Sequence, residues 1–288
     1  MTRTYGHKRL SVVFGVVGTF LVLVSACNAP DSPPKDDTQG QATEETTTDA
    51  AASADDRELA KKLEDLGVVC RLDDAGHLIL VDASGGKLND ENLQLLAEAK
   101  YLRAVKLTGC PVSDKAMEVL AGLTTLKSVG LDDTQVGNAG VAALDGLERL
   151  EELFLTRTPI DDAAAESIAK HPKLRRLRLR GTAITDAALA KLEGLTALED
   201  IDLSETNVGD AGVESLAKLP ALVRLNLWTT KVTDAAAPTL AGMTQLKWLN
   251  LDNTVVSDAA VAELAKLPNL EFLHLGRSKI TDAAIDAL

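Results

Sequence analysis

Apolar residues recur along the chain with a period of 24 residues, from Leu78 to the C-terminus. The first leucine of each copy falls at Leu78, Leu102, Leu126, Leu150, Leu174, Leu198, Leu222, Leu246 and Leu270. Numbered from that leucine, each copy follows the pattern L-x-x-L-x-L-x-x-T-x-V/I-x-D-A, as in residues 174–187. A fixed period of this length is typical of a solenoid, in which each unit buries its apolar face against its neighbours.

The pattern within one copy predicts a strand, a turn and a helix. Leucines at positions four and six alternate with polar residues, which indicates a short strand with one buried face. Position nine is Thr in six consecutive copies, Thr134 to Thr254, and we expect its hydroxyl to bond the backbone where the chain turns. A small or polar residue followed by Asp and Ala is a helix N-cap signal, and apolar residues three apart continue it as a helix. The predicted fold class is therefore an α/β solenoid, with a parallel sheet on the concave face and short helices on the convex face.

This motif resembles the leucine-rich repeat family over residues 78–288, which hold nine copies, the last one truncated. The T-x-V/I-x-D-A segment is similar to a ribonuclease-inhibitor-like subtype that many bacterial envelope proteins carry. One departure is Thr at position nine, where the family usually has Asn or Cys. The resemblance implies a fold and says little about function.

The N-terminus has the features of an export signal. Arg3, Lys8 and Arg9 precede an apolar run of 15 residues (10–24), which is short for a membrane span. The run ends in Ser-Ala-Cys27, which is similar to the lipobox of bacterial lipoproteins. Residues 1–26 are therefore predicted to be a signal peptide and Cys27 the site of lipidation, with an ordinary secretory signal as the alternative. Asn28 after the cysteine favours the outer membrane, by resemblance to Gram-negative lipoproteins.

Two further segments separate this signal from the repeats. Residues 28–54 contain no Leu, Ile, Val, Phe, Tyr or Trp and several Pro and acidic residues, which predicts a disordered linker over 27–54. Residues 55–77 are predicted to form an N-terminal cap, with a helix over 55–66 that buries Leu59, Leu63 and Leu66, followed by a hairpin of 68–72 and 77–81. No such cap follows the ninth repeat, so that end is either frayed or a surface for self-association.

Charge and cysteine content exclude some classes of function. Without residues 1–26 the charge is 27 − 43 = −16, which disfavours binding to nucleic acid or anionic lipid. We expect Cys70 and Cys110 to be free, buried thiols, because about two strand spacings would separate them.

No pattern indicates catalysis, a metal or a cofactor. The histidines lack metal-ligand spacing, and no G-x-S-x-G or phosphate-binding loop is present. One Asp recurs in most copies, and helix capping explains it without an ion; these residues are Asp114, Asp162, Asp186, Asp210, Asp234, Asp258 and Asp282.

Residues at positions three, five and seven should project from the concave sheet in columns, since the copies stack in register. Aromatic residues make up only 3% of the chain, yet both Trp and two of the four Phe fall in these columns. Exposed Trp and Arg are frequent interface anchors, although such rings also cover a sheet or stack on an Arg. The predicted partner-binding residues are Arg180, Arg224, Trp228, Trp248, Asn250, Phe272 and His274.

Arginines crowd one strand of the concave face. Arg176 should pair with Glu152 and Asp200, and Arg178 with Asp202, whereas Arg180 has only Thr156 and Ser204 beside it. We therefore expect Arg180 to be available to an acidic ligand. The sequence favours a non-enzymatic, lipid-anchored module that binds a protein or peptide. The alternative is a structural envelope protein that associates laterally or with itself.

Overall fold

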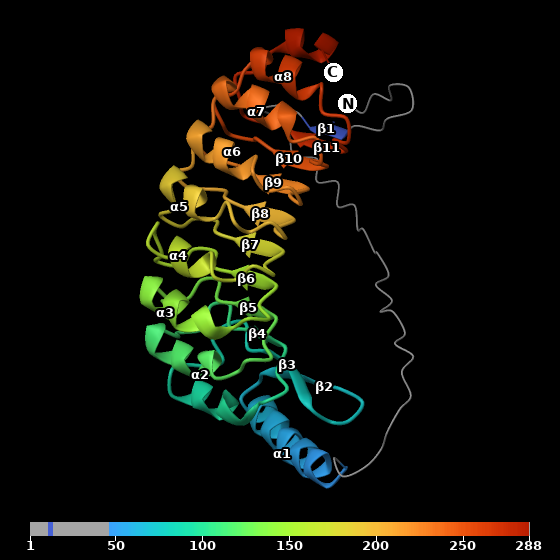
Figure 1. Ribbon diagram of the computed structural model, residues 1–288. Coiled ribbons are helices and arrows are strands. Elements are labelled where there is room, and N and C mark those ends of the chain that lie inside the picture. Colours follow the sequence, from blue (N-terminus) through green and yellow to red (C-terminus); the bar gives the residue numbers. More distant parts are fainter. Residues whose placement is uncertain (1–10, 14–45, 288) are drawn as a thin grey trace.

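The computed structural model describes residues 11–13 and 46–287. Its centre is a stack of nine parallel strands, one from each repeat, and each strand pairs in register with the strand 24 residues further on. Figure 1 shows the stack as an arch, with the strands along its concave side and the helices along its convex side. The predicted α/β solenoid is confirmed. The strands are β3 (Leu78–Asp82), β4 (Ala104–Lys106), β5 (Ser128–Gly130), β6 (Glu152–Phe154), β7 (Arg176–Arg178), β8 (Asp200–Asp202), β9 (Arg224–Asn226), β10 (Trp248–Asn250) and β11 (Phe272–His274).

The convex side is built from short helices, because a 24-residue unit must also accommodate a strand and two connections. Thr185, Thr233 and Ser257 cap their helices, each accepting a hydrogen bond from the backbone N–H two residues on. The α-helices are α2 (Met117–Ala121), α3 (Asn138–Ala143), α4 (Ala165–Ile168), α5 (Asp186–Lys191), α6 (Asp210–Leu216), α7 (Ala237–Gly242) and α8 (Asp258–Leu264). The 3-10 helices are η1 (Asn92–Glu98), η2 (Asp114–Ala116), η3 (Leu144–Gly146), η4 (Asp234–Ala236) and η5 (Asp282–Ala287).

The repeat leucines form one continuous core between the two layers. Leu177, Leu179, Leu225 and Leu227 have no exposed surface, as predicted for positions four and six. Burying one leucine side chain contributes roughly 1.5–3 kcal/mol, and each copy contributes several. The stack therefore depends on the same few positions in every repeat.

The turn after each strand uses the same backbone conformation in every repeat. Position eight has a positive φ throughout, as at Gly109 (71°) and Glu205 (58°). At position nine, Thr182 Oγ1 donates to the carbonyl of Leu179 at 2.6 Å, and the same bond recurs from Thr134 to Thr254. This bond confirms the role expected of the threonine. Cys110 differs, since its thiol donates to the carbonyl of Ala83 in the preceding repeat.

The recurring aspartates do not act as simple helix caps, which corrects the expectation from sequence. Asp162 accepts the backbone N–H of Thr185 at 2.8 Å and its hydroxyl at 2.6 Å, and Thr185 is the N-cap of the next repeat's helix. Asp234 binds Ser257 in the same way. The carboxylate reaches the next repeat because helices stack in phase, so the Asp and the following cap residue face each other across the interface. This aspartate ladder joins neighbouring repeats on the convex side.

The N-terminal cap is larger than predicted. Helix α1 (Thr46–Asp65) begins nine residues before the expected start at residue 55 (55 − 46 = 9). Its first turns carry Ala-rich sequence with high helix propensity, which the absence of large apolar residues had obscured. Leu63 is fully buried as predicted, whereas Leu66 is 43% exposed.

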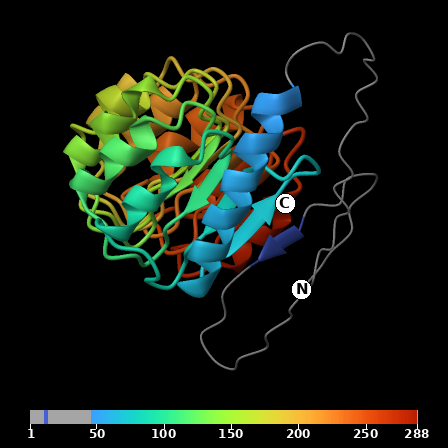
Figure 2. The same cartoon turned by 90° about the horizontal axis from the view of Figure 1, so that it is seen from below.

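The predicted hairpin is present beside this helix. Strand β2 (Val69–Leu72) pairs antiparallel with β3, and Figure 2 shows α1 lying next to β2 across the end of the solenoid. The carboxylate of Asp56 accepts the N–H of Leu78 at 2.9 Å, which fastens the helix to the first repeat. Both cysteines are free thiols as expected, but only Cys110 is buried, since Cys70 on the edge strand β2 is half-buried.

At the other end, β1 (Ser11–Val13) pairs parallel with β11. These residues lie within the predicted signal peptide, so their pairing with the last repeat was not expected. Ser-Val-Val is compatible with a strand, and it satisfies main-chain groups that the last repeat leaves at the sheet edge. Cys27 and most of the predicted linker lie outside the described residues. Among the helices that the structure describes, none is both long and apolar enough to cross a membrane.

Candidate functional site

The last three strands place flat side chains side by side on the concave face. The guanidinium carbon of Arg224 lies 4.5 Å from the centre of the Trp248 ring. Trp248 and Phe272 stack with ring centres 5.2 Å apart and planes within 4°, and His274 meets the edge of Phe272 at 6.3 Å. We call these four residues the aromatic row. The predicted proximity of Arg224, Trp248 and Phe272 is confirmed.

The strand register produces this row. Trp248 is the register partner of Arg224 on one side and of Phe272 on the other, so three side chains at position three stand in one column. Leu249, the next residue in β10, points into the core and has no exposed surface. The rings are half-buried, with the remaining surface directed away from the core. Stacking of this kind holds a flat apolar surface in place without a ligand.

Trp228 forms a second cluster at position seven. Arg180 lies 4.8 Å from the centre of its ring and Arg277 lies 5.7 Å from it. Within the described residues, the indole Nε1 is buried and has no hydrogen-bond partner. Buried polar groups are usually bonded, so this N–H is a donor that a conformational change or a ligand can satisfy.

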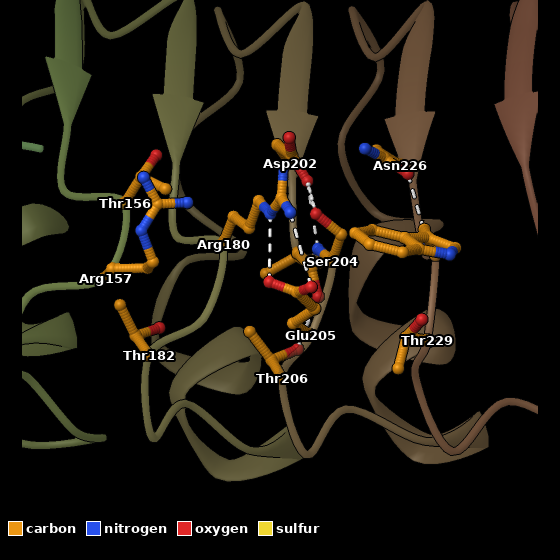
Figure 3. A network of polar contacts seen from close by, with 12 residues as sticks. Thr156, Arg157, Arg180, Thr182, Asp202, Ser204, Glu205, Thr206, Asn226 and Thr229 are labelled. Atoms are coloured by element: carbon orange, nitrogen blue, oxygen red, sulfur yellow. Dashed lines mark hydrogen bonds and ion pairs between the residues drawn. The ribbon is translucent and has the colours of Figure 1, made fainter. Parts of the chain in front are cut away.

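Arg180 is not free, contrary to the expectation from sequence. Its Nε donates to Glu205 Oε2 at 3.0 Å, and this pairing lowers the pKa of the Glu205 carboxyl. Figure 3 shows Arg180 directed toward Glu205, next to Ser204. Glu205 occupies position eight, where the left-handed turn directs the side chain back over the preceding repeat. Only positions three, five and seven are expected from the strand pattern to face the concave side, so the role of Glu205 was not predicted.

The other arginines of β7 are also paired. Arg176 donates to Glu152 at 2.6 Å, as predicted. Arg178 forms a two-pronged contact with Asp200, at 2.9 and 2.6 Å, and not with the expected Asp202. Asp202 instead accepts the N–H and hydroxyl of Ser204 within its own turn. The shift to a diagonal partner follows from the length of the arginine side chain.

A buried carboxylate supports the C-terminal end of the row. Asp252 is only 5% exposed and accepts hydrogen bonds from Arg277, another position-eight residue that is not among the predicted site residues. His274 Nε2 lies 4.0 Å from the same carboxylate. Burial lowers the pKa of His274, and Arg277 acts in the same direction against the attraction of Asp252. The imidazole is therefore mostly neutral at pH 7, and it contributes an aromatic surface to the row instead of a positive charge.

Asn250 has a structural role in this region. Its Oδ1 accepts the backbone N–H of Asp252 at 2.9 Å, and Asn226 binds Trp228 in the same way one repeat earlier. The asparagine carbonyl is thus directed at its own strand end. Of the seven residues predicted to bind a partner, Arg224, Trp248, Phe272 and His274 form the row. Arg180 and Trp228 form the second cluster, and Asn250 shapes the turn between the two groups.

The described part of the chain shows no arrangement for metal chemistry. No three His, Cys, Asp or Glu side chains there come together in a way that could hold an ion. His171 is buried, with Nδ1 3.3 Å from the carbonyl of Leu147. The site consists instead of rings, guanidinium groups and balanced carboxylates, which is the chemistry of a contact surface.

Comparison with known proteins agrees with this geometry. Residues 194–217 match the leucine-rich repeat family model. A comparison with curated proteins gave no match. By its fold the chain is similar to leucine-rich repeat structures, and one of its repeats matches the family model.

Three solved structures share the fold. Internalin C2 of Listeria monocytogenes is 24% identical with a TM-score of 0.54, over 79% of this chain and 86% of its own. Internalin InlF of the same organism is 17% identical with a TM-score of 0.50, over 82% and 79%. The ectodomain of the Arabidopsis receptor kinase HAESA, solved with an extended IDA peptide hormone, is 14% identical with a TM-score of 0.60, over 80% of this chain. This chain spans only 42% of that ectodomain's length.

Proposed function

We propose that this protein is a non-enzymatic binding module that holds a protein or peptide partner on the aromatic row. The observation that carries the proposal is the stack of Arg224, Trp248 and Phe272, a flat and half-exposed surface built in a chain with few aromatic residues. Trp supplies a large contact area at a small cost in side-chain entropy, and Trp and Arg are frequent among the residues that dominate interface energetics. The peptide complex of the HAESA ectodomain, on the same fold, is consistent with this role.

The balance of charge indicates the kind of contact. Arg178, Arg180 and Arg277 each have a carboxylate partner, so none offers an unpaired charge to an acidic ligand. Recognition should therefore rest on stacking and apolar contact over the rings. The paired charges around the rings would hold them in place and would not bind the partner directly. We infer that the partner presents aromatic, proline or long aliphatic side chains to the row.

Two variants test the proposal in a pull-down from envelope extracts. Trp248→Ala removes the centre of the row, whereas Phe154→Ala removes a half-buried aromatic from β6 of the same concave sheet. We expect the partner to be lost with the first variant and kept with the second. Equal retention by both variants, with both proteins folded, would contradict the proposal.

Intrinsic fluorescence supplies a second readout. The chain has only two tryptophans, and both lie on the concave face near the C-terminal end. A partner that covers the row should shift the tryptophan emission to shorter wavelength at saturation. An unchanged emission spectrum would place the partner elsewhere on the molecule.

We also propose that the module is exported and anchored to the bacterial envelope through a lipid on Cys27, with the outer membrane as its destination. The basic start, the apolar run and the Ser-Ala-Cys sequence support this. Metabolic labelling with palmitate should mark the wild-type protein and leave the Cys27→Ser variant unlabelled. Equal labelling of both would exclude the anchor.

Self-association as a structural envelope protein is the alternative outcome. Sedimentation at increasing protein concentration distinguishes the two functions. The sedimenting mass of a binding module should not change with concentration. Assembly that grows with concentration and persists in Trp248→Ala would favour the structural role.

A further inference from the structure

A second concave feature lies away from the aromatic row, where the chain enters strands β4 to β6. It is a pocket of about 490 Å³. The lining residues come from the position before each repeat's first leucine and from position two, and they are Tyr101, Arg103, Thr125, Lys127 and Arg149. Three of the five are cations, in a chain whose formal net charge is −13.

From Lys127 to Glu199, the charges at position two alternate in sign from one repeat to the next. Lys127 pairs with Glu151 at 2.8 Å, and Arg175 pairs with Glu199 at 2.8 Å. Arg103 breaks the alternation, because its neighbour in the next repeat is Lys127 and not an acid. Like charges on neighbouring strands repel each other, so this position is unfavourable unless an anion lies between them.

Two arginines of the pocket keep their charge uncompensated. Within the described chain, neither Arg103 nor Arg149 has a carboxylate within 4.0 Å, although 14 other Lys and Arg residues of the repeats do. Both side chains are exposed. A guanidinium presents five N–H donors in a planar fork, which matches the oxygens of phosphate. Two unpaired guanidinium groups also match the charge of a phosphate monoester.

Two of the five lining residues, Tyr101 and Thr125, are held in place by contacts within the chain. The Tyr101 ring stacks on His77 with centres 3.8 Å apart, and His77 Nδ1 lies 3.4 Å from Asp73 Oδ2. The Thr125 hydroxyl donates to the carbonyl of Leu102 at 2.8 Å. A site whose walls are ordered in advance loses less entropy on binding than a mobile one.

We propose that this pocket binds a phosphate group, held by Arg103 and Arg149 with Lys127 contributing a third donor. The phosphate belongs either to a small soluble molecule or to a lipid headgroup, and both share the oxyanion chemistry that the pocket recognises. The site is separate from the aromatic row. The proposal of phosphate binding can therefore be correct or wrong whatever the outcome for partner binding.

The test titrates inorganic phosphate into the full chain at low salt and follows the Arg Nε–H and Tyr101 ring signals by NMR. We expect saturable shifts at Arg103, Arg149 and Tyr101, and affinity at least about tenfold weaker in the Arg103→Gln/Arg149→Gln variant. The control variant Lys115→Gln/Lys231→Gln removes the same charge from exposed positions elsewhere and should change the affinity less than about twofold. Shifts that do not saturate, or equal weakening in both double variants, would overturn the proposal.

Two further ligands identify the source of the phosphate. Glycerol phosphate represents a soluble monoester, and short-chain dibutyryl phosphatidylglycerol represents a headgroup without forming a bilayer. Tighter, arginine-dependent binding of the first supports a soluble ligand, and tighter binding of the second supports a headgroup. Binding of neither, at concentrations where inorganic phosphate saturates the pocket, would overturn the assignment to a phosphate carrier.

Discussion

Asp210 in one repeat binds Thr233 in the next through both of its carboxylate oxygens. One oxygen accepts the backbone N–H of Thr233 at 2.8 Å, and the other accepts its hydroxyl at 2.7 Å. Because Thr233 is also the N-cap of η4, one carboxylate joins two neighbouring repeats and positions the start of a helix. The relationship recurs along the convex side, so coupling between repeats does not depend on apolar packing alone.

Removing this contact should destabilise the protein measurably. We expect Asp210→Ala to lower the free energy of unfolding by about 1–3 kcal/mol, since it leaves two partners without their acceptor. Urea denaturation measures the change. Asp186→Ala is the matched control, because Asp186 accepts only the N–H of Gly209 and should cost about 1 kcal/mol less. A larger loss for Asp186→Ala than for Asp210→Ala would contradict this account.

Thr229 is strained, and relieving the strain should stabilise the protein. Its φ of 55° lies in the left-handed region, which a β-branched residue rarely adopts. Glycine occupies the same position in three other repeats. We expect Thr229→Gly to raise the free energy of unfolding by about 0.5–1 kcal/mol, after allowance for the entropy of glycine and the bond from Asn253.

The adjacent threonine is the control for that change. Thr230 is buried, and its hydroxyl donates to the carbonyl of Leu227 at 2.7 Å. Thr230→Gly should therefore lower the urea midpoint while Thr229→Gly raises it. If both substitutions lower it, strain at Thr229 is not the dominant effect.

Cys70 should react slowly with thiol reagents. Burial, helped by the charge of Glu64, raises the pKa of its thiol from 9.0 to about 11. The thiolate is the reactive form, so alkylation at pH 8 should be about 100-fold slower than for an ordinary exposed cysteine. Val69→Cys in a Cys70→Ser background places a thiol one residue away at a position that is 61% exposed, and it should react at the ordinary rate. Peptide mass spectrometry follows both sites, and similar rates would refute the prediction.

Two histidines should make the protein less stable in mild acid. Burial lowers the pKa of His171 below 6.5, as it does for His274. Between 6.5 and the lowered pKa, the unfolded chain binds protons that the folded chain does not, so the free energy of unfolding falls as pH decreases. His171→Leu should flatten this part of the pH profile in chemical denaturation. A profile unchanged by that substitution would show that His171 does not contribute.

The spacing of leucines was sufficient to predict the fold, because a strict period leaves few ways to bury every copy of Leu177 and its equivalents. The start of α1 could not be predicted in the same way. The first part of that helix has no large apolar residues that could form a buried face. Only the helix propensity of its alanines indicates that this part is helical. Pairing of β1 with β11 could not be predicted either, since a segment as short as Ser-Val-Val fits many positions equally well.

Only those contacts of the candidate site that follow from the strand register could be predicted from the sequence. Trp248 lies between Arg224 and Phe272 as expected, since equal positions in successive repeats become neighbours. Glu205 and Arg277 are outside that rule, because a left-handed residue at position eight redirects its side chain toward the preceding repeat. The choice of Asp200 over Asp202 by Arg178 likewise depends on the reach of a long side chain.

Pairing between β1 and β11 brings residues from the start of the chain to the far end of the arch, as Figure 1 shows. Cleavage ahead of Cys27, as proposed, would therefore have two effects. It would release the leader, and it would leave the outer main-chain groups of Phe272–His274 without their strand. Maturation would then alter the molecule beside the aromatic row, some 250 residues from the cut (272 − 27 = 245). The precursor and the mature protein would differ in what they can bind as well as in length.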